Sequence, residues 1–297
     1  MILKETTIVI TNGVARNVDL FGVSVLDKRD RLISPDSSFF AVWNKNRWVA
    51  GKSIPFRIVG LNVIGNPANH FILLGENGEI STMGGGKDEI EQITRDIDLP
   101  LTNIINSGSQ LYVVGMGRQI YSRVQESIWI PIHNGVLSER SDKIHGFQTI
   151  VKTDSHLYAG GWGGEIWFYN GTKWSQEVSP TNFILSDSTI TNKGQIVFCG
   201  RNGTIVIGES GIWNIIDTGI ISDDLWSTVY YDNKLYFSSG SHIYFLDDEQ
   251  LVEVSFEIQG YNGTHYKLQV IDNHLFSFGE RDILVFDGKD WSRILTE

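Results

Sequence analysis

One pattern recurs along this chain at intervals of about forty residues. In the stretch LYAGGWGGEI, residues 157–166, an apolar run leads through a glycine-rich turn to Ile166. The same pattern ends at five further isoleucines, with successive spacings of 40, 46, 39, 38 and 40 residues: Ile80, Ile120, Ile205, Ile243 and Ile283. A weaker seventh copy surrounds Phe40. Because self-similarity at a fixed period indicates a repeat architecture, this pattern constrains the fold more than any other feature.

A second landmark keeps step with the first. Large apolar residues follow the anchors by eight to ten positions: Trp48, Ile90, Trp129, Trp174, Trp213, Leu251 and Trp291. Each copy accommodates four short strands, which in the fourth copy are predicted at 149–152, 156–160, 165–169 and 173–178. No sustained apolar period of 3.6 residues supports helical repeats. The sequence therefore predicts an all-β fold, a single seven-bladed β-propeller with four antiparallel strands in each blade.

The predicted propeller occupies the whole chain, residues 1–297, as one domain. Blade one is expected from about Asn17 to Lys52. Thr6–Ile10 is predicted to be a spare strand that Asn12-Gly13 turns back, since Asn-Gly is a strong hairpin signal. This N-terminal strand, 6–10, is expected to join one of the terminal blades as an edge.

The charge of the chain favours some partners over others. The net charge is −11 and the isoelectric point about 5.1, which disfavours nucleic acid and anionic membranes and suits a protein with a basic surface. The first ten residues, MILKETTIVI, lack the apolar core and cleavage site of a signal peptide. The single cysteine, Cys199, excludes an internal disulfide and reads as a small core residue. We expect a cytoplasmic monomer.

Two short segments, YNGTKW at 169–174 and FDGKDW at 286–291, resemble the repeats of bacterial Asp-box and kelch-like propellers. The resemblance implies a propeller architecture and carries no function with it. The Asp-box pattern is Ser-x-Asp-x-Gly-x-x-Trp, whereas here the Asn or Asp directly precedes Gly171 or Gly288.

Asp-box propellers include sialidases, which use three arginines, carboxylates and a tyrosine nucleophile. Arg118, Arg201 and Arg281 fall in equivalent turns between strands, which keeps a glycan-binding or glycan-cleaving propeller open as an alternative. The Arg-Ile-Pro start of that family is missing, and no motif marks a general base. The seven histidines are scattered over different blades, so neither a metal nor another cofactor is expected. The sequence favours a protein that is not an enzyme.

Candidate partner-binding residues lie in the predicted loops, which should emerge on one side of the ring. An exposed Trp or Tyr flanked by charge is typical of interface hot spots. The candidates are Arg118, Trp162, Arg201, Asp223, Asp224, Trp226, Tyr261, Glu280, Arg281 and Asp282.

A small acidic propeller without a catalytic signature has the character of a dedicated binding protein. In that character it is similar to the immunity proteins that neutralise bacterial toxins. We therefore expect a non-catalytic propeller that binds a protein. A sialidase-like glycan-binding propeller and an assembly or scaffold factor remain the alternatives.

Overall fold

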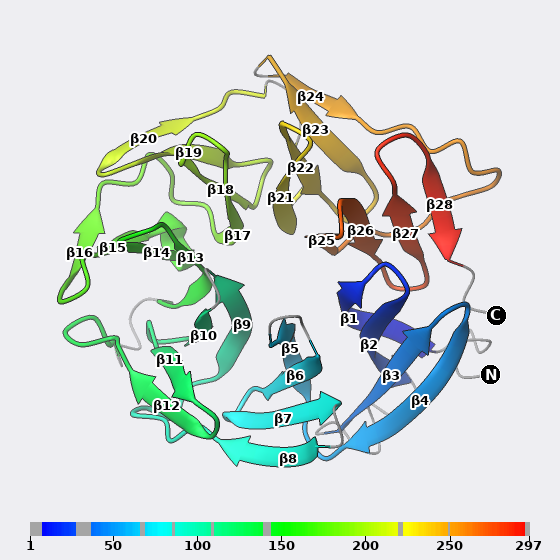
Figure 1. Ribbon diagram of the computed structural model, residues 1–297. Helices are drawn as coiled ribbons and strands as arrows, with labels where there is room; N and C mark the ends of the chain where they lie inside the picture. Colours follow the sequence, from blue (N-terminus) through cyan, green and yellow to red (C-terminus); the bar gives the residue numbers. More distant parts are fainter. Residues whose placement is uncertain are drawn as a thin grey trace.

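The computed structural model describes residues 8–27, 37–65, 69–84, 87–107, 110–138, 144–218, 222–248 and 250–294. Within these ranges, 28 strands form seven four-stranded antiparallel sheets that are arranged as blades in a ring (Figure 1). The only helical turn among the described residues is the 3-10 turn η2, Trp162–Gly164. The predicted seven-bladed all-β propeller is confirmed. No helix in the part of the chain described here is long and apolar enough to cross a membrane.

Every blade consists of four strands that are consecutive in the sequence. Blades one to four contain β1 (Ile8–Asn17), β2 (Leu20–Asp27), β3 (Ser38–Asn44) and β4 (Arg47–Ile54); β5 (Ile58–Ile64), β6 (His70–Gly75), β7 (Glu79–Gly84) and β8 (Lys87–Gln92); β9 (Leu101–Ser107), β10 (Gln110–Gly115), β11 (Ile120–Gln125) and β12 (Ile128–Pro131); β13 (Phe147–Lys152), β14 (Leu157–Gly161), β15 (Ile166–Tyr169) and β16 (Trp174–Glu177). Blades five to seven contain β17 (Leu185–Ile190), β18 (Ile196–Gly200), β19 (Ile205–Glu209) and β20 (Ile212–Ile215); β21 (Ser227–Tyr231), β22 (Lys234–Ser238), β23 (Ile243–Asp247) and β24 (Gln250–Glu253); β25 (Lys267–Ile271), β26 (His274–Phe278), β27 (Ile283–Phe286) and β28 (Trp291–Ile294).

The repeated anchors have a single structural role. Each one lies in the third strand of its blade, and all seven are fully buried at 0% exposure: Phe40, Ile80, Ile120, Ile166, Ile205, Ile243 and Ile283. The second landmark lies in the fourth strands, where Trp174 is 3% and Trp213 8% exposed. Trp174 belongs to an apolar cluster shared by blades three and four, and Trp213 to one shared by blades four and five. The repeat thus encodes the apolar contacts that hold neighbouring blades together.

The start of the first blade differs from the prediction. Strand β1 runs from Ile8 to Asn17 without a turn and pairs with β2, so it is the innermost strand of blade one and not a spare strand. Asn12-Gly13 lies inside β1, next to an irregularity in the pairing, and the hairpin comes later, at Val18-Asp19. Residues 6 and 7 lie outside the described residues. The prediction of a turn at Asn12-Gly13 is therefore wrong.

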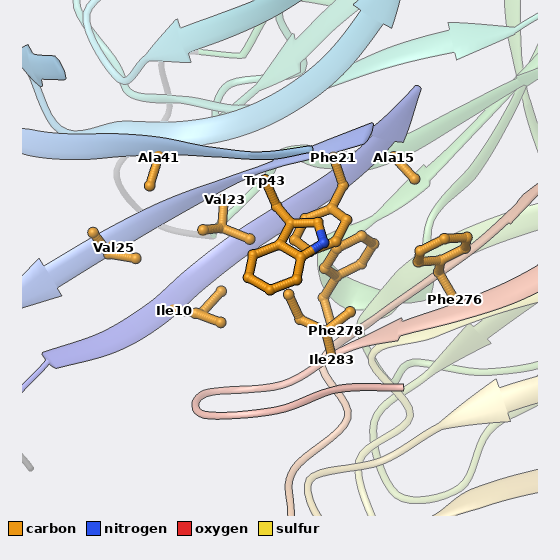
Figure 2. Packing of buried hydrophobic residues seen from close by; sticks show 10 residues of the cluster. All are labelled: Ile10, Ala15, Phe21, Val23, Val25, Ala41, Trp43, Phe276, Phe278 and Ile283. Atoms are coloured by element: carbon orange, nitrogen blue, oxygen red, sulfur yellow. The ribbon is translucent and has the colours of Figure 1, made fainter. Parts of the chain in front are cut away.

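The reason for Gly13 is a close contact and not a turn. A Cβ atom at Gly13 would lie 2.1 Å from the ring of Phe278, which comes from blade seven. Phe278 and Phe21 belong to one cluster of buried side chains in which blade seven packs against blade one (Figure 2). Two backbone contacts reinforce this seam: Ile10 N donates to Glu280 O at 2.7 Å, and Ala15 N donates to the side-chain oxygen of Gln269 at 2.7 Å. Among the described residues, the ring closes by packing between two four-stranded blades, and none of their strands joins the sheet of the other.

The strand order decides which loops share a face of the ring. Within each blade the chain passes from the innermost strand outward, so the turn after the second strand and the link to the next blade emerge on the same side. We call this side the linker face. It carries the described parts of the turns after β2, β6, β10, β14, β18, β22 and β26 and of the links 55–57, 93–100, 132–146, 178–184, 216–226 and 254–266.

Candidate functional site

All ten candidate residues lie on the linker face, in the turns after the second strands or in the links between blades. The turns hold Arg118, Trp162, Arg201, Glu280, Arg281 and Asp282, and the links hold Asp223, Asp224, Trp226 and Tyr261. Loops on a rigid scaffold are the usual place for binding, which makes this face the candidate interface. Its members differ sharply in their access to solvent.

Arg118 is a structural residue of the boundary between blades three and four. Its Nε lies 2.6 Å from Glu165 Oε2 and its Nη2 2.7 Å from Glu165 Oε1, a bidentate ion pair. The guanidinium also lies over the ring of Trp167, 5.0 Å from its centre. His145 Nδ1 lies 2.7 Å from Glu165 Oε1. The side chains of Arg118 and Glu165 are only 14% and 11% exposed, so Arg118 presents little of its charge to a partner.

Glu165 is charged because its surroundings offset its burial. Burial alone would raise the pKa of this carboxyl group. Hydrogen bonds from Arg118 and the indole of Trp167, the attraction of the Arg118 charge and the His145 contact together hold the pKa below its ordinary value of 4.5. No sequence motif marks this cluster, because its members come from two blades and the link between them.

The link before blade six is attached to the turn of blade five. Asn202 N donates to Asp224 Oδ1 at 3.0 Å, and Gly203 N donates to the carbonyl oxygen of Asp223 at 2.8 Å. Arg201 lies 3.8 Å from Asp224 with 49% of its side chain exposed. These contacts place three predicted candidates side by side on the surface of blade five.

The carboxylate of Asp223 faces the turn of blade six. It accepts hydrogen bonds from the Ser239 hydroxyl and the Tyr244 phenol and lies close to His242 Nδ1, each at 3.2 Å. Burial acts to raise its pKa, but the contacts with His242, Tyr244 and Ser239 outweigh burial and lower it. Asp223 is therefore a partly buried anion that joins the link to blade six.

The two candidate tryptophans have different surroundings. Trp226 is 38% exposed and meets Tyr266, itself 37% exposed, edge to face with 6.2 Å between ring centres. Both residues stand just before the innermost strand of their blades. Trp162, in contrast, is half-buried in η2, and its buried indole nitrogen has no hydrogen-bond partner among the residues that the structure describes. The pair of Trp226 and Tyr266 is therefore more accessible to a partner than Trp162.

The candidates at blade seven are mostly internal. Asp282 is 7% exposed and pairs with Arg293, and Tyr261 packs on Phe256 with 5.2 Å between ring centres. Burial, followed by the nearby Asp282 charge, raises the pKa of Tyr261 well above its ordinary value. Glu280 is half-buried and Arg281 exposed. Of these four candidates, only Arg281 belongs to the exposed residues.

The linker face also carries a hollow that sequence reasoning missed. It has a volume of about 990 Å³ and is lined by residues 179–183, 202–204, 215–218 and 222. Phe183 stands in this hollow with 43% of its surface exposed. The available signal was a lone aromatic residue in the polar link SPTNF, residues 179–183.

The central channel is lined by residues of the innermost strands and has a volume of about 340 Å³. Asp187 and Lys267 line it, with 3.8 Å between the ammonium and a carboxylate oxygen. Asp187 also accepts a hydrogen bond from the Ser227 hydroxyl at 2.6 Å. Over the described ranges, no group of three or more His, Cys, Asp or Glu residues is arranged to hold a metal ion.

Comparison with solved structures supports the fold, and comparison with known sequences supports the family. No family model matches the chain. Two solved propellers share the fold at low identity. YCF48 bound to D1 peptide has a TM-score of 0.69 at 12% identity, covering 100% of this chain and 94% of that one. The RRP9 WD40 repeats have a TM-score of 0.66 at 11% identity, covering 94% of this chain and 90% of theirs. The Asp-box or kelch-like subtype remains a resemblance.

The comparison at the level of sequence is more specific. The immune protein Tsi7 of Pseudomonas aeruginosa (strain PAO1) is 32% identical to this chain over 306 residues. The match covers 98% of this chain and 99% of Tsi7, so it extends over all seven blades. The prediction of an immunity protein agrees with this match, and the chain belongs to the family of the immune protein Tsi7.

Proposed function

We propose that this protein is an immunity protein that neutralises a toxin by binding it through the linker face, without catalysing a reaction. The observation that carries the proposal is the full-length match with the immune protein Tsi7. A closed ring of blades is a rigid scaffold, and a preformed surface loses little conformational entropy when it binds.

The proposed partner is a toxin protein with a basic surface. The net charge of −11 makes an encounter with a basic protein electrostatically favourable and salt-dependent. We further propose that the protein acts as a monomer in the cytoplasm, which size-exclusion chromatography and cell fractionation test.

Binding without chemistry is also consistent with the state of the three arginines that suggested a sialidase-like site. Arg118 is engaged by Glu165, and Arg201 lies beside Asp224. Arg281 also interacts with another group of the protein. A sialidase needs its arginines directed at a substrate carboxylate, and Arg118 is committed to the boundary between two blades.

The test is affinity capture from the native host with the tagged protein, followed by co-expression of the captured protein in a sensitive bacterium. We expect the captured protein to be toxic alone and harmless when this chain is co-expressed. A captured protein that is harmless alone, or whose toxicity persists despite binding, would contradict the proposal. Turnover of a sialoside by the purified chain would contradict its non-catalytic part.

A further inference from the structure

The hollow on the linker face lies over blade five, between two links. One wall is the link from blade four, residues 179–183, and the other is formed by residues 215–218 and 222 on the way to blade six. The turn 202–204 of blade five lies between them. At about 990 Å³ the hollow is large enough to receive several side chains of a partner.

Two apolar residues of this hollow are exposed. Phe183, in the link from blade four, is 43% exposed, and Ile215, at the end of β20, is 47% exposed. In other links some apolar residues are buried, such as Phe56 at 4% and Leu225 at 0%, and others are exposed, such as Ile144 at 62%. An aromatic side chain left at the surface of a concave site is the type of residue that dominates binding energy in protein interfaces.

The walls of the hollow are held in place by backbone contacts. Arg201 N donates to Ile184 O at 2.9 Å, which ties the first link to the turn of blade five. Gly203 N donates to Asp223 O at 2.8 Å, which ties the second link to the same turn. A Cβ atom at Gly164 would lie 2.4 Å from the Thr181 carbonyl oxygen, so the turn η2 also packs directly on the first link. The hollow is therefore preformed.

The negative charge of the chain is concentrated in the sector of the ring that blades five to seven form. Residues 180–297, which include blades five to seven, contain 17 acidic and 7 basic residues, a net charge of −10. Residues 1–179 contain 18 acidic and 17 basic residues, a net charge of −1. Asp217 lines the hollow and is exposed, and Asp223 and Asp224 follow it in the same link between blades five and six. A polar and charged rim around an apolar centre is the usual anatomy of a protein interface.

We propose that this hollow is the docking site for the toxin, and that it receives a protruding segment with basic residues around one apolar side chain. The apolar side chain packs on Phe183 and Ile215, and the basic residues face Asp217, which lines the hollow, and Asp224 beside it. This inference rests on the proposed function and specifies which part of the linker face carries it.

The first experiment measures affinity for the purified captured toxin with two pairs of variants. Phe183→Ser removes the apolar centre, and its control is Ile90→Ser on the outer strand of blade two, where Ile90 is 63% exposed. Asp217→Lys reverses a charge in the hollow, and its control is Asp154→Lys in an exposed turn on the opposite face.

Phe183→Ser should weaken affinity by at least about 30-fold, the size of a hot spot. Asp217→Lys should lower the association rate at low salt by about 10-fold. Both controls should stay within about 2-fold of the wild type.

An unchanged affinity in the two hollow variants, with all four variants unfolding at the wild-type urea midpoint, would overturn the inference while leaving the proposed function standing.

The second experiment does not need the toxin. Its probe is a capped peptide with one phenylalanine between flanking lysines and arginines, titrated into the protein calorimetrically at low salt.

The peptide should bind the wild type and both controls, and both hollow variants should bind it at least about 3-fold more weakly. A peptide that binds all variants equally, or does not bind the wild type, contradicts the docking site. If the peptide discriminates as expected and capture yields no toxin, the site stands as a receptor for basic segments and the proposed function fails.

Discussion

Two boundaries between blades on the linker face use arginine in opposite ways. At the boundary between blades three and four, Arg118 is 14% exposed and forms a bidentate pair with Glu165 of the next blade. At the boundary between blades five and six, Arg201 is 49% exposed and lies 3.8 Å from Asp224 in a link. The first boundary is closed by a buried charge network, and the second leaves an accessible charged surface beside the hollow.

The residue before each buried anchor explains the difference. Glu165 directly precedes Ile166 in blade four and supplies the carboxylate that Arg118 needs. In blade six the residue before Ile243 is His242, which lies 3.2 Å from Asp223. Arg201 therefore has no acidic partner at the corresponding position of the next blade. In these two blades, the residue before the anchor differs in whether it offers a carboxylate to the arginine of the preceding turn.

The largest effect that separates the two regions is expected for the aromatic residues. Trp174 stacks on Phe147 at the closed boundary, with 6.3 Å between ring centres, and its indole donates to Ile132 O at 2.6 Å. Trp174→Ala should lower the free energy of unfolding by about 3–5 kcal/mol because it opens a cavity between blades. Phe183→Ala in the hollow should cost less than about 0.5 kcal/mol. Urea unfolding measures both, and equal losses would show that Phe183 is part of the core.

The next effect concerns the charge at the closed boundary. Arg118→Met leaves Glu165 largely buried without its cation, and we expect a loss of about 2–4 kcal/mol in the free energy of unfolding. Arg201→Met at the open boundary should change it by no more than about 1 kcal/mol. The control is Arg118→Met combined with Glu165→Gln, which should recover part of the loss. A loss for Arg118→Met as small as that for Arg201→Met would mean that the pair is solvated.

The same pair predicts a dependence of stability on pH. The pKa of Glu165 is lowered in the folded protein, so its ionised form contributes stability that is present above its ordinary value of 4.5 and is lost as pH falls through the folded value. The difference in unfolding free energy between the wild type and Glu165→Gln should therefore be largest near neutral pH and shrink in acid. Urea titrations at several pH values test this, and a difference that grows in acid would reverse the sign.

The repeat made the architecture predictable from the sequence. In the fourth copy the predicted strands 149–152, 156–160, 165–169 and 173–178 agree with β13 to β16 to within two residues at each end. The first blade was less predictable, because Asn12-Gly13 has the composition of a hairpin turn and is instead a close contact with Phe278 from the other end of the chain. Only the closed ring brings these residues together.

The sequence predicted which face of the ring carries the candidate residues, but not which of their side chains are exposed. The period places Arg118 and Arg201 in the turns after second strands, but the direction of each side chain depends on residues of the next blade or link. Phe183 has no counterpart in the repeated pattern, because the links vary in length and sequence. Exposure in such a link is set by how the chain crosses between blades, which local periodicity does not encode.

The smallest expected effect is the coupling between Arg201 and Asp224. Both side chains are in contact with water, at 49% and 36% exposure, and their nearest charged atoms are 3.8 Å apart. Exposed pairs of this kind contribute about 0–1 kcal/mol, and salt screens them further. A double-mutant cycle with Arg201→Met and Asp224→Asn should give a coupling below about 0.5 kcal/mol that disappears at high salt. Asp224→Asn retains an oxygen that can accept from Asn202 N, so the attachment of the link is preserved. A coupling as large as that between Arg118 and Glu165 would show that the open boundary is held by charge as firmly as the closed one, and the difference between the two regions would then lie in the hollow alone.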